Sequence, residues 1–147
     1  MGLKTSAGLK TLAMSVAIFA LSRGAGQAAE IQFAAALTGG GEVPANATAG
    51  TGMATATLDT ATKVFHYVVT YSGLTGPAVA AHFHGPALAG NNAPPVITIK
   101  SLPSPMNGEA TLTDPQIADL EAGRWYFNVH TADHPTGEIR GQLAKTP

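Results

Sequence analysis

The sequence predicts an all-β fold: an antiparallel, Greek-key-like β-sandwich or barrel with one short helix near residues 115–122. From Glu30 onward, runs of alternating or β-branched residues are separated every eight to twelve residues by Gly, Pro, Asn or Asp, which is typical of sandwiches and barrels. Only one stretch has helical spacing. The chain contains no cysteine, so a hydrophobic core rather than a disulfide framework must hold it together.

Eight segments have the composition of strands, and turn residues separate them. They are residues 31–38, 52–60, 63–72, 78–85, 95–102, 108–114, 125–131 and 137–143. The exception is TDPQIADLEAG, where Thr113 or Asp114 precedes Pro115 and Gly123 closes the segment. A cap residue, a first-turn proline and a terminal glycine are the start and stop signals of a helix. We expect this helix to cross one end of the sandwich.

Residues 1–29 have the composition of a secretory signal peptide. Lys4 and Lys10 precede the apolar run TLAMSVAIFALS, and the small residues GAGQAA follow it. An apolar run of about a dozen residues fits a signal peptide and is well short of the ~20 needed to cross a bilayer. We therefore expect cleavage after Ala28 or Ala29. The exported domain would cover residues 30–147, contain no membrane span, and reside in the periplasm or the extracellular medium.

Composition excludes several classes of function. Without its first 29 residues the chain keeps five basic and nine acidic residues, a formal charge of 5 − 9 = −4, so we expect no nucleic-acid partner. The absence of cysteine excludes thiolate metal sites and cysteine nucleophiles. Histidine, carboxylate and methionine are the side chains left to hold a transition metal.

The candidate site begins with His82 and His84 in the segment AAHFHGPA. Residues i and i+2 of a strand face the same side, roughly 6.7 Å apart, so two imidazoles leaning inward can share a metal at about 2.0–2.1 Å per bond. Phe83 faces the opposite, buried side. Alternation in WYFNVHT places His130 on the polar face of another strand, near its end as His84 is. If the two strands are neighbours, we expect the three histidines to converge at one rim.

Five further residues are candidates for completing or supporting the site. His134 and Asp133 lie in a turn, where solvated loop residues are the plainer interpretation. His66 lies in VFHYVVTY, where a hydrogen-bonded core or edge histidine is the alternative to a ligand. Glu138 and Arg140 share one face of a strand. They form either a structural ion pair or a support for the site, in which Glu138 accepts the free N–H of a metal-bound histidine.

Three ordered motifs are spread over residues 37–143, which make up most of residues 30–147. They are LTGGGEVPANATAGTGMATATLD, YSGLTGPAVAAHFHGPA and WYFNVHTADHPTGEIRGQL. In these motifs the sequence resembles the CHRD domain family, named after repeats in chordin, an extracellular antagonist of growth factors. The resemblance implies an extracytoplasmic β-sandwich, with His82, His84 and His130 at positions where the family pattern carries histidine. Many bacterial members of this family are single secreted domains.

We expect these three histidines to bind one transition ion, with His66, His134 or water completing the shell. We expect this ion to be copper, with zinc as the alternative, because the order of affinities of such sites favours Cu²⁺ over Zn²⁺. Binding should weaken as the pH falls through the histidine pKa near 6.5. Two other functions stay open: a metal-free structural or adhesive module that binds a protein or polysaccharide, and a metal-dependent enzyme with an open coordination position.

Overall fold

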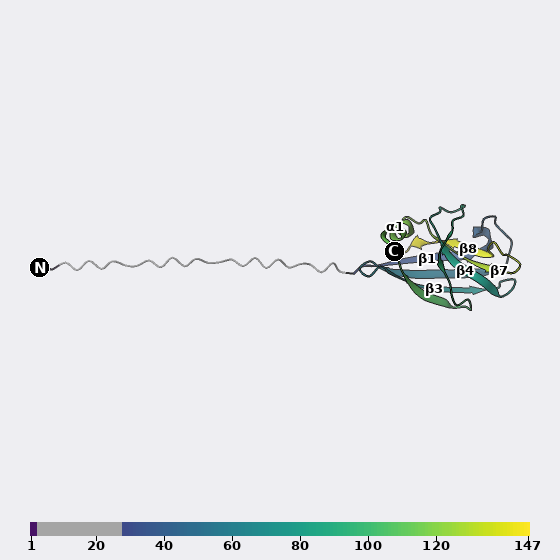
Figure 1. The fold of residues 1–147 in the computed structure, drawn as a ribbon, viewed down its shortest axis with the longest axis horizontal. Helices are drawn as coiled ribbons and strands as arrows, with labels where there is room; N and C mark the ends of the chain where they lie inside the picture. The colour runs from purple at the N-terminus through teal and green to yellow at the C-terminus, as the bar shows by residue number, and fades with distance from the viewer. Residues whose placement is uncertain (3–27) are drawn as a thin grey trace.

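The described part of the chain contains nine strands, one α-helix and one short 3-10 helix (Figure 1). The computed structural model describes residues 1–2 and 28–147, so the signal peptide expected over residues 1–29 lies almost entirely outside the described residues. The elements are β1 (Glu30–Thr38), η1 (Gly39–Gly41), β2 (Thr51–Asp59), β3 (Val64–Ser72), β4 (Ala78–His84), β5 (Pro95–Thr98), β6 (Met106–Thr111), α1 (Asp114–Glu121), β7 (Tyr126–Thr131), β8 (Ile139–Gln142) and β9 (Ala144–Lys145).

The strands form one antiparallel sheet in the order β5-β4-β7-β8-β1-β2-β3-β6, with β9 beside β1. The sheet curls into a nearly closed barrel. Its two edge strands approach each other, since Ile97 of β5 and Asn107 of β6 line a common cavity. The predicted all-β fold with one short helix is therefore confirmed.

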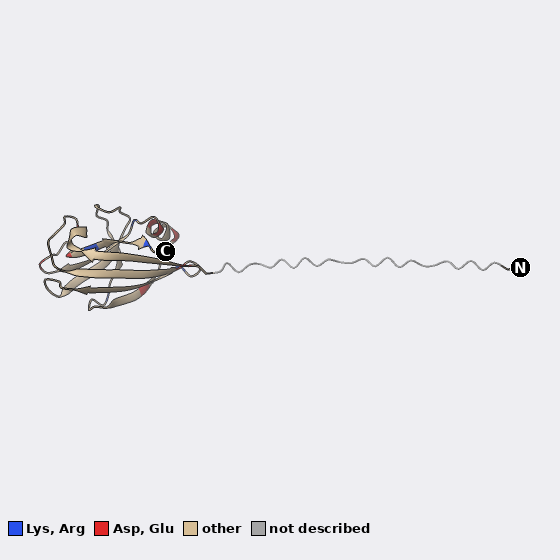
Figure 2. Cartoon of the chain, turned by 180° about the vertical axis from the view of Figure 1, so that it is seen from behind, with Lys and Arg blue, Asp and Glu red and all other residues tan. Residues whose placement is uncertain are grey.

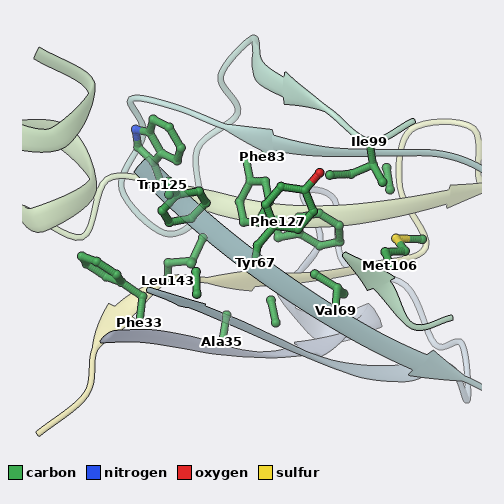
Figure 3. Close-up of a cluster of buried hydrophobic side chains, with 14 of the residues drawn as sticks. Phe33, Ala35, Tyr67, Val69, Phe83, Ile99, Met106, Trp125, Phe127 and Leu143 are labelled. Carbon is green, nitrogen blue, oxygen red and sulfur yellow. The ribbon is translucent and has the colours of Figure 1, made fainter. Parts of the chain in front are cut away.

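The core is filled by alternate residues of the strands, as a period of two requires. Phe33 of β1, Phe65 of β3 and Phe83 of β4 are each at most 1% exposed. Figure 3 shows the aromatic rings gathered between the strands. The Phe83 and Phe127 rings meet edge to face with centroids 4.7 Å apart, an arrangement that adds to the free energy gained from burial alone.

The helix α1 begins and ends where the sequence signals placed it. The Thr113 side chain accepts the Gln116 backbone N–H, and the Gln116 side chain accepts the Thr113 backbone N–H in return, which forms a capping box. Gly123 follows the helix at φ 69°, a conformation that glycine adopts without steric cost. Leu120 anchors the helix in the core with no exposed surface. No helix among the described residues is long and apolar enough to span a membrane.

Strand boundaries differ most from the expectation in two places. The strand expected over residues 95–102 ends at Thr98, because the pairing of β5 with β4 ends there. Beyond it, the Ile99 backbone N–H still donates one hydrogen bond to the Ala81 carbonyl. The strand expected over residues 108–114 begins earlier, at Met106, whose side chain is fully buried. Figure 2 shows that most of the ribbon seen from behind is neither acidic nor basic.

Candidate metal centre

Strand pairing brings the three predicted histidines together. Strands β4 and β7 are neighbours, with His82 opposite Asn128 and Phe83 opposite Phe127. Because side chains alternate along each strand, both phenylalanines enter the core while the histidines share the outer face. The sequence-based expectation that Phe83 points away from the histidines into a buried face is confirmed.

The histidines meet on the face of the sheet and not at one rim. His84 is the last residue of β4 and His130 lies near the end of β7. Because the two strands are antiparallel, these residues lie toward opposite ends of the strand pair. In the register of the pair His84 faces Tyr126, whereas His130 faces Ala80. His82 lies between the two and bridges them. The expected convergence at a shared rim was wrong because it treated the two strand ends as if they pointed the same way.

The ring nitrogens have separations close to those of a shared ligand shell. His82 Nδ1 and His130 Nε2 are 3.3 Å apart. Two nitrogens on one tetrahedral ion, each about 2.0–2.1 Å from it, are also separated by about 3.3 Å. One nitrogen from each of the three rings falls within 4.8 Å of the others. The His82–His130 nitrogen separation therefore matches that of two ligands on one ion, and His84 would need to move closer by up to about 1.5 Å.

Backbone carbonyls fix the tautomers of two of the rings. His84 Nδ1 lies 2.8 Å from the Ala93 carbonyl oxygen, and His130 Nδ1 lies 3.1 Å from that of Pro135. A carbonyl oxygen only accepts, so each Nδ1 carries the proton and each neutral ring keeps its lone pair on Nε2. Metal-binding histidines are characteristically held in this way by the nitrogen that does not bind the metal.

Burial lowers the pKa of all three imidazoles below the ordinary value of 6.5. For His82, the charges that His130 and His84 would carry lower it further. Hydrogen bonds to Ala93 and Pro135 oppose the effect of burial at His84 and His130 respectively. The rings are therefore neutral at pH 7, the protonation state that metal coordination requires.

Tyr126 and Arg140 hold His84 and the loop that covers it. The Tyr126 ring lies flat against the His84 ring, with centroids 4.7 Å apart and 3° between the planes. The Arg140 guanidinium carbon lies 3.4 Å from the centroid of the Tyr126 ring. The Tyr126 hydroxyl accepts the Ala93 N–H and donates to the Ala93 carbonyl, while Arg140 donates to two oxygens of residues 91–92. The carbonyl that orients His84 is thus itself held in place.

The additional ligand candidates lie outside this cluster. Among the described residues, His82, His84 and His130 are the only set of three or more potential ligands close enough to share an ion. His66 is exposed on β3, and its Nδ1 lies 3.2 Å from a carboxylate oxygen of Glu109. His134 is half-buried and Asp133 is exposed in the turn after β7. The structure therefore brings none of these residues to the three histidines.

Glu138 stabilises the fold through hydrogen bonds to threonine residues and does not bond to a histidine ring. Its fully buried carboxylate accepts hydrogen bonds of 2.5–2.8 Å from the Thr48, Thr75 and Thr131 hydroxyls and from the Thr75 backbone N–H. Burial raises the pKa of Glu138, but these bonds outweigh it and lower the pKa to about 2. The expected bond from Glu138 to a histidine N–H is absent, and no described ion pair joins it to Arg140. Backbone carbonyls take that orienting role instead.

Two residues near the site were not predicted to have a function. Asn128 is buried beside His84, and its side-chain amide lies 3.0 Å from Nε2 of that ring. Because Nε2 holds the lone pair, the NH₂ group of the amide is the part that donates to it. Glu42 is only 6% exposed. Burial raises its pKa to about 7, although the Arg140 guanidinium, the Asn128 side chain and the Val43 N–H each act to lower it.

The sequence did contain a signal for Glu42. It is the only charged residue between Thr38 and Gly52, a segment that otherwise holds glycine, alanine, threonine, valine, proline and asparagine. A lone acidic residue in such a segment is either solvated at the tip of a loop or buried against a partner group. Asn128 had no comparable signal, because a polar residue in an alternating strand is ordinary.

The comparison with family models agrees with this architecture. The model of the CHRD domain matches residues 33–143. The chain belongs to the CHRD domain family. The match spans β1 to the residue after β8, so it includes the sheet that carries the three histidines in this CHRD domain. A search of curated proteins and a search of solved structures each found no match. CHRD domains occur in extracellular and secreted proteins, in agreement with the setting expected from the sequence.

Proposed function

We propose that this CHRD domain is an exported protein that binds one transition-metal ion through His82, His84 and His130. The observation that carries the proposal is the 3.3 Å separation of His82 Nδ1 and His130 Nε2, together with the carbonyl bonds that leave the Nε2 lone pairs of His84 and His130 unprotonated. Copper is proposed ahead of zinc, because a nitrogen site of unconstrained geometry binds Cu²⁺ more tightly. Three protein ligands leave a coordination position for water or an external group.

The proposed export rests on the segment before the domain. Cleavage after Ala28 or Ala29 would leave a chain that begins at the first residue of β1, Glu30, or one residue before it. The periplasm and the extracellular medium are both compatible with a domain that contains no cysteine. N-terminal sequencing of the processed protein and its location in cell fractions test this part of the proposal.

Metal analysis of the processed protein tests the binding site. Copper and zinc affinities are measured for the wild type and for the His82→Ala and His84→Ala variants. The expected result is better than micromolar affinity in the wild type and loss of about 100-fold or more in each variant. His66→Ala is the matched control, because His66 is an exposed strand histidine outside the cluster. Weaker than micromolar binding of both metals by the wild type would refute the proposal.

A second candidate function is a metal-free module that binds a protein or polysaccharide outside the cytoplasm. It is favoured by the fact that both ring nitrogens of His84 already have hydrogen-bond partners, the Ala93 carbonyl and the Asn128 side-chain amide. In that case the histidines hold the covering loop and nothing more. Loss of thermal stability in His84→Ala, with no metal bound by the wild type, would support this second function.

A further inference from the structure

A cavity of about 320 Å³ opens between the two edge strands of the sheet. Ile97 and Thr98 of β5 line it from one side, and Asn107, Gly108 and Glu109 of β6 line it from the other. Within the described residues each edge strand pairs with one neighbour only, β5 with β4 and β6 with β3. The cavity is therefore bordered on both sides by strand edges whose outward N–H and C=O groups have no partner strand.

The hydroxyl of a buried tyrosine lies at this cavity without a hydrogen-bond partner. Tyr67 lines the cavity, lies directly opposite Gly108 in the β3–β6 pair, and is only 7% exposed. Its oxygen occupies the space that a side chain at Gly108 would take, since a Cβ atom there would collide with it. Figure 3 shows this oxygen at the far end of the ring, on the side of Ile99. Burial raises the pKa of Tyr67, and no hydrogen bond to a described residue acts on it. The hydroxyl is therefore a donor without an acceptor.

The β6 edge lacks the features that usually protect an edge strand. Its residues, Met106–Thr111, pair with β3 in an unbroken register and include neither proline nor lysine. The β5 edge differs, because it begins at Pro95 and its pairing with β4 shifts register after Phe83. Proline, lysine and bulges are devices by which edge strands avoid pairing with another chain. The β6 edge is therefore the one open to an added strand.

We propose that the β6 edge binds an extended peptide segment of a partner protein, which adds a strand beside β6 and fills the cavity. The backbone of the segment pairs with that of β6, as in other cases of strand addition, and one of its carbonyls accepts the Tyr67 hydroxyl. A small ligand without a peptide backbone satisfies the hydroxyl but leaves the strand edge unpaired. This inference does not rest on the proposed metal site.

Charge and the alternation of side chains determine which segment fits. Glu109 is exposed on the outer face of β6, and a residue opposite it on an added strand lies about 4.5–5.5 Å away, where opposite charges stabilise the pair. Lys100 also lines the cavity, but it lies beyond the last residue of β5 and not on the strand that the segment joins. Residues that face inward meet Tyr67 and Ile97. The segment therefore alternates basic residues, which face outward, with apolar residues, which face inward.

Titration with short peptides, followed in ¹⁵N-correlated spectra of the processed protein without metal, tests this inference. The probe is acetyl-VKVKV-amide. Its binding should be in the millimolar range or tighter, with shifts concentrated in Met106–Thr111 and the other residues around the cavity. Acetyl-VEVEV-amide reverses the charge, and acetyl-VKPKV-amide removes one backbone N–H. Each should bind about three- to fivefold more weakly.

Two variants separate recognition of the peptide from folding. Tyr67→Phe should weaken binding of acetyl-VKVKV-amide about fivefold, while Tm stays unchanged because the hydroxyl has no partner to lose. Glu109→Gln, an exposed change, should remove the preference for the basic over the acidic peptide. Tyr71→Phe is the matched control and should leave peptide affinity unchanged, because the Tyr71 hydroxyl donates to the Leu102 carbonyl outside the cavity.

Several results would overturn the inference. They are the absence of shifts up to about 10 mM peptide, shifts concentrated away from β6 and the cavity, and equal or tighter binding of the acidic or proline-containing peptide. Unchanged affinity in Tyr67→Phe would likewise refute the assigned contact with the tyrosine hydroxyl. None of these outcomes depends on whether the histidines bind a metal.

Discussion

Replacing Glu138 with glutamine should destabilise the protein by about 3 kcal/mol at pH 7. The carboxylate has no exposed surface and receives four hydrogen bonds from Thr48, Thr75 and Thr131, which belong to three different segments. Glutamine has a similar shape, but it replaces one accepting oxygen with an NH₂ group that would face donors. The change therefore removes the charge and leaves buried donors unsatisfied.

The size of the effect follows from the pKa of Glu138. The hydrogen bonds outweigh burial and lower this pKa from 4.5 to about 2. At 1.36 kcal/mol per pKa unit, the folded state gains about 3 kcal/mol from the ionised form. Because the pKa is depressed, this contribution is complete above pH 4.5 and is lost as the pH falls toward 2. In a domain of this size it corresponds to a change in Tm of roughly 10 °C.

Denaturant unfolding at pH 7 and at about pH 2.5 measures this contribution. The difference between wild type and Glu138→Gln should be about 3 kcal/mol at pH 7 and should shrink to less than about 1 kcal/mol at the lower pH. The matched control is Glu109→Gln, because Glu109 is an exposed strand acid whose neighbour is His66. A difference at pH 7 below about 0.5 kcal/mol, or one that is independent of pH, would refute the reasoning.

Three further predictions concern the site and the core behind it. Burial lowers the pKa of the three histidines below 6.5. Zinc affinity measured from pH 8 to 4.5 should therefore fall with a midpoint below pH 6.5, and a fall completed by pH 6.5 would contradict this. Tyr126→Phe removes the hydroxyl that holds Ala93 and should weaken zinc binding up to about tenfold. Tyr71→Phe, which loses a similar bond to Leu102, should cost about 1 kcal/mol of stability without changing affinity. Phe83→Ala should cost about 3–5 kcal/mol in chemical denaturation, since its ring is fully buried against Phe127; a cost below about 2 kcal/mol would mean that the core collapses around the gap.

Local signals predicted much of the fold correctly. The helix was found because its cap, its first-turn proline and its terminal glycine act within a few residues of one another. Five of the eight expected strands overlap their observed counterparts almost fully, since turn residues mark both ends. The strand expected over residues 95–102 was too long because its end depends on where its partner β4 stops pairing with it. The residues near that point do not indicate which strand pairs with them.

The candidate site was predicted only in part, for a related reason. Alternation assigned His82, His84 and His130 to outward faces, which needs no knowledge of the neighbouring strands. Their meeting on the face of the sheet depended on the antiparallel pairing of β4 with β7. The support expected from Glu138 is given instead by the carbonyls of Ala93 and Pro135. Both residues have apolar side chains, so nothing in the sequence indicated that their backbone carbonyls would orient a histidine.

The sequence by itself determined which residues form strands, which of their faces are buried, and that histidine is the main nitrogen ligand in a chain without cysteine. These properties follow from short-range geometry and from composition. Tertiary structure alone decided that His82, His84 and His130 share one face, that Tyr126 and Arg140 secure the loop above them, and that Glu42 is buried. Those contacts depend on which distant strands pair, and the choice of pairing is made by the packing free energy of the whole barrel rather than by any local pattern.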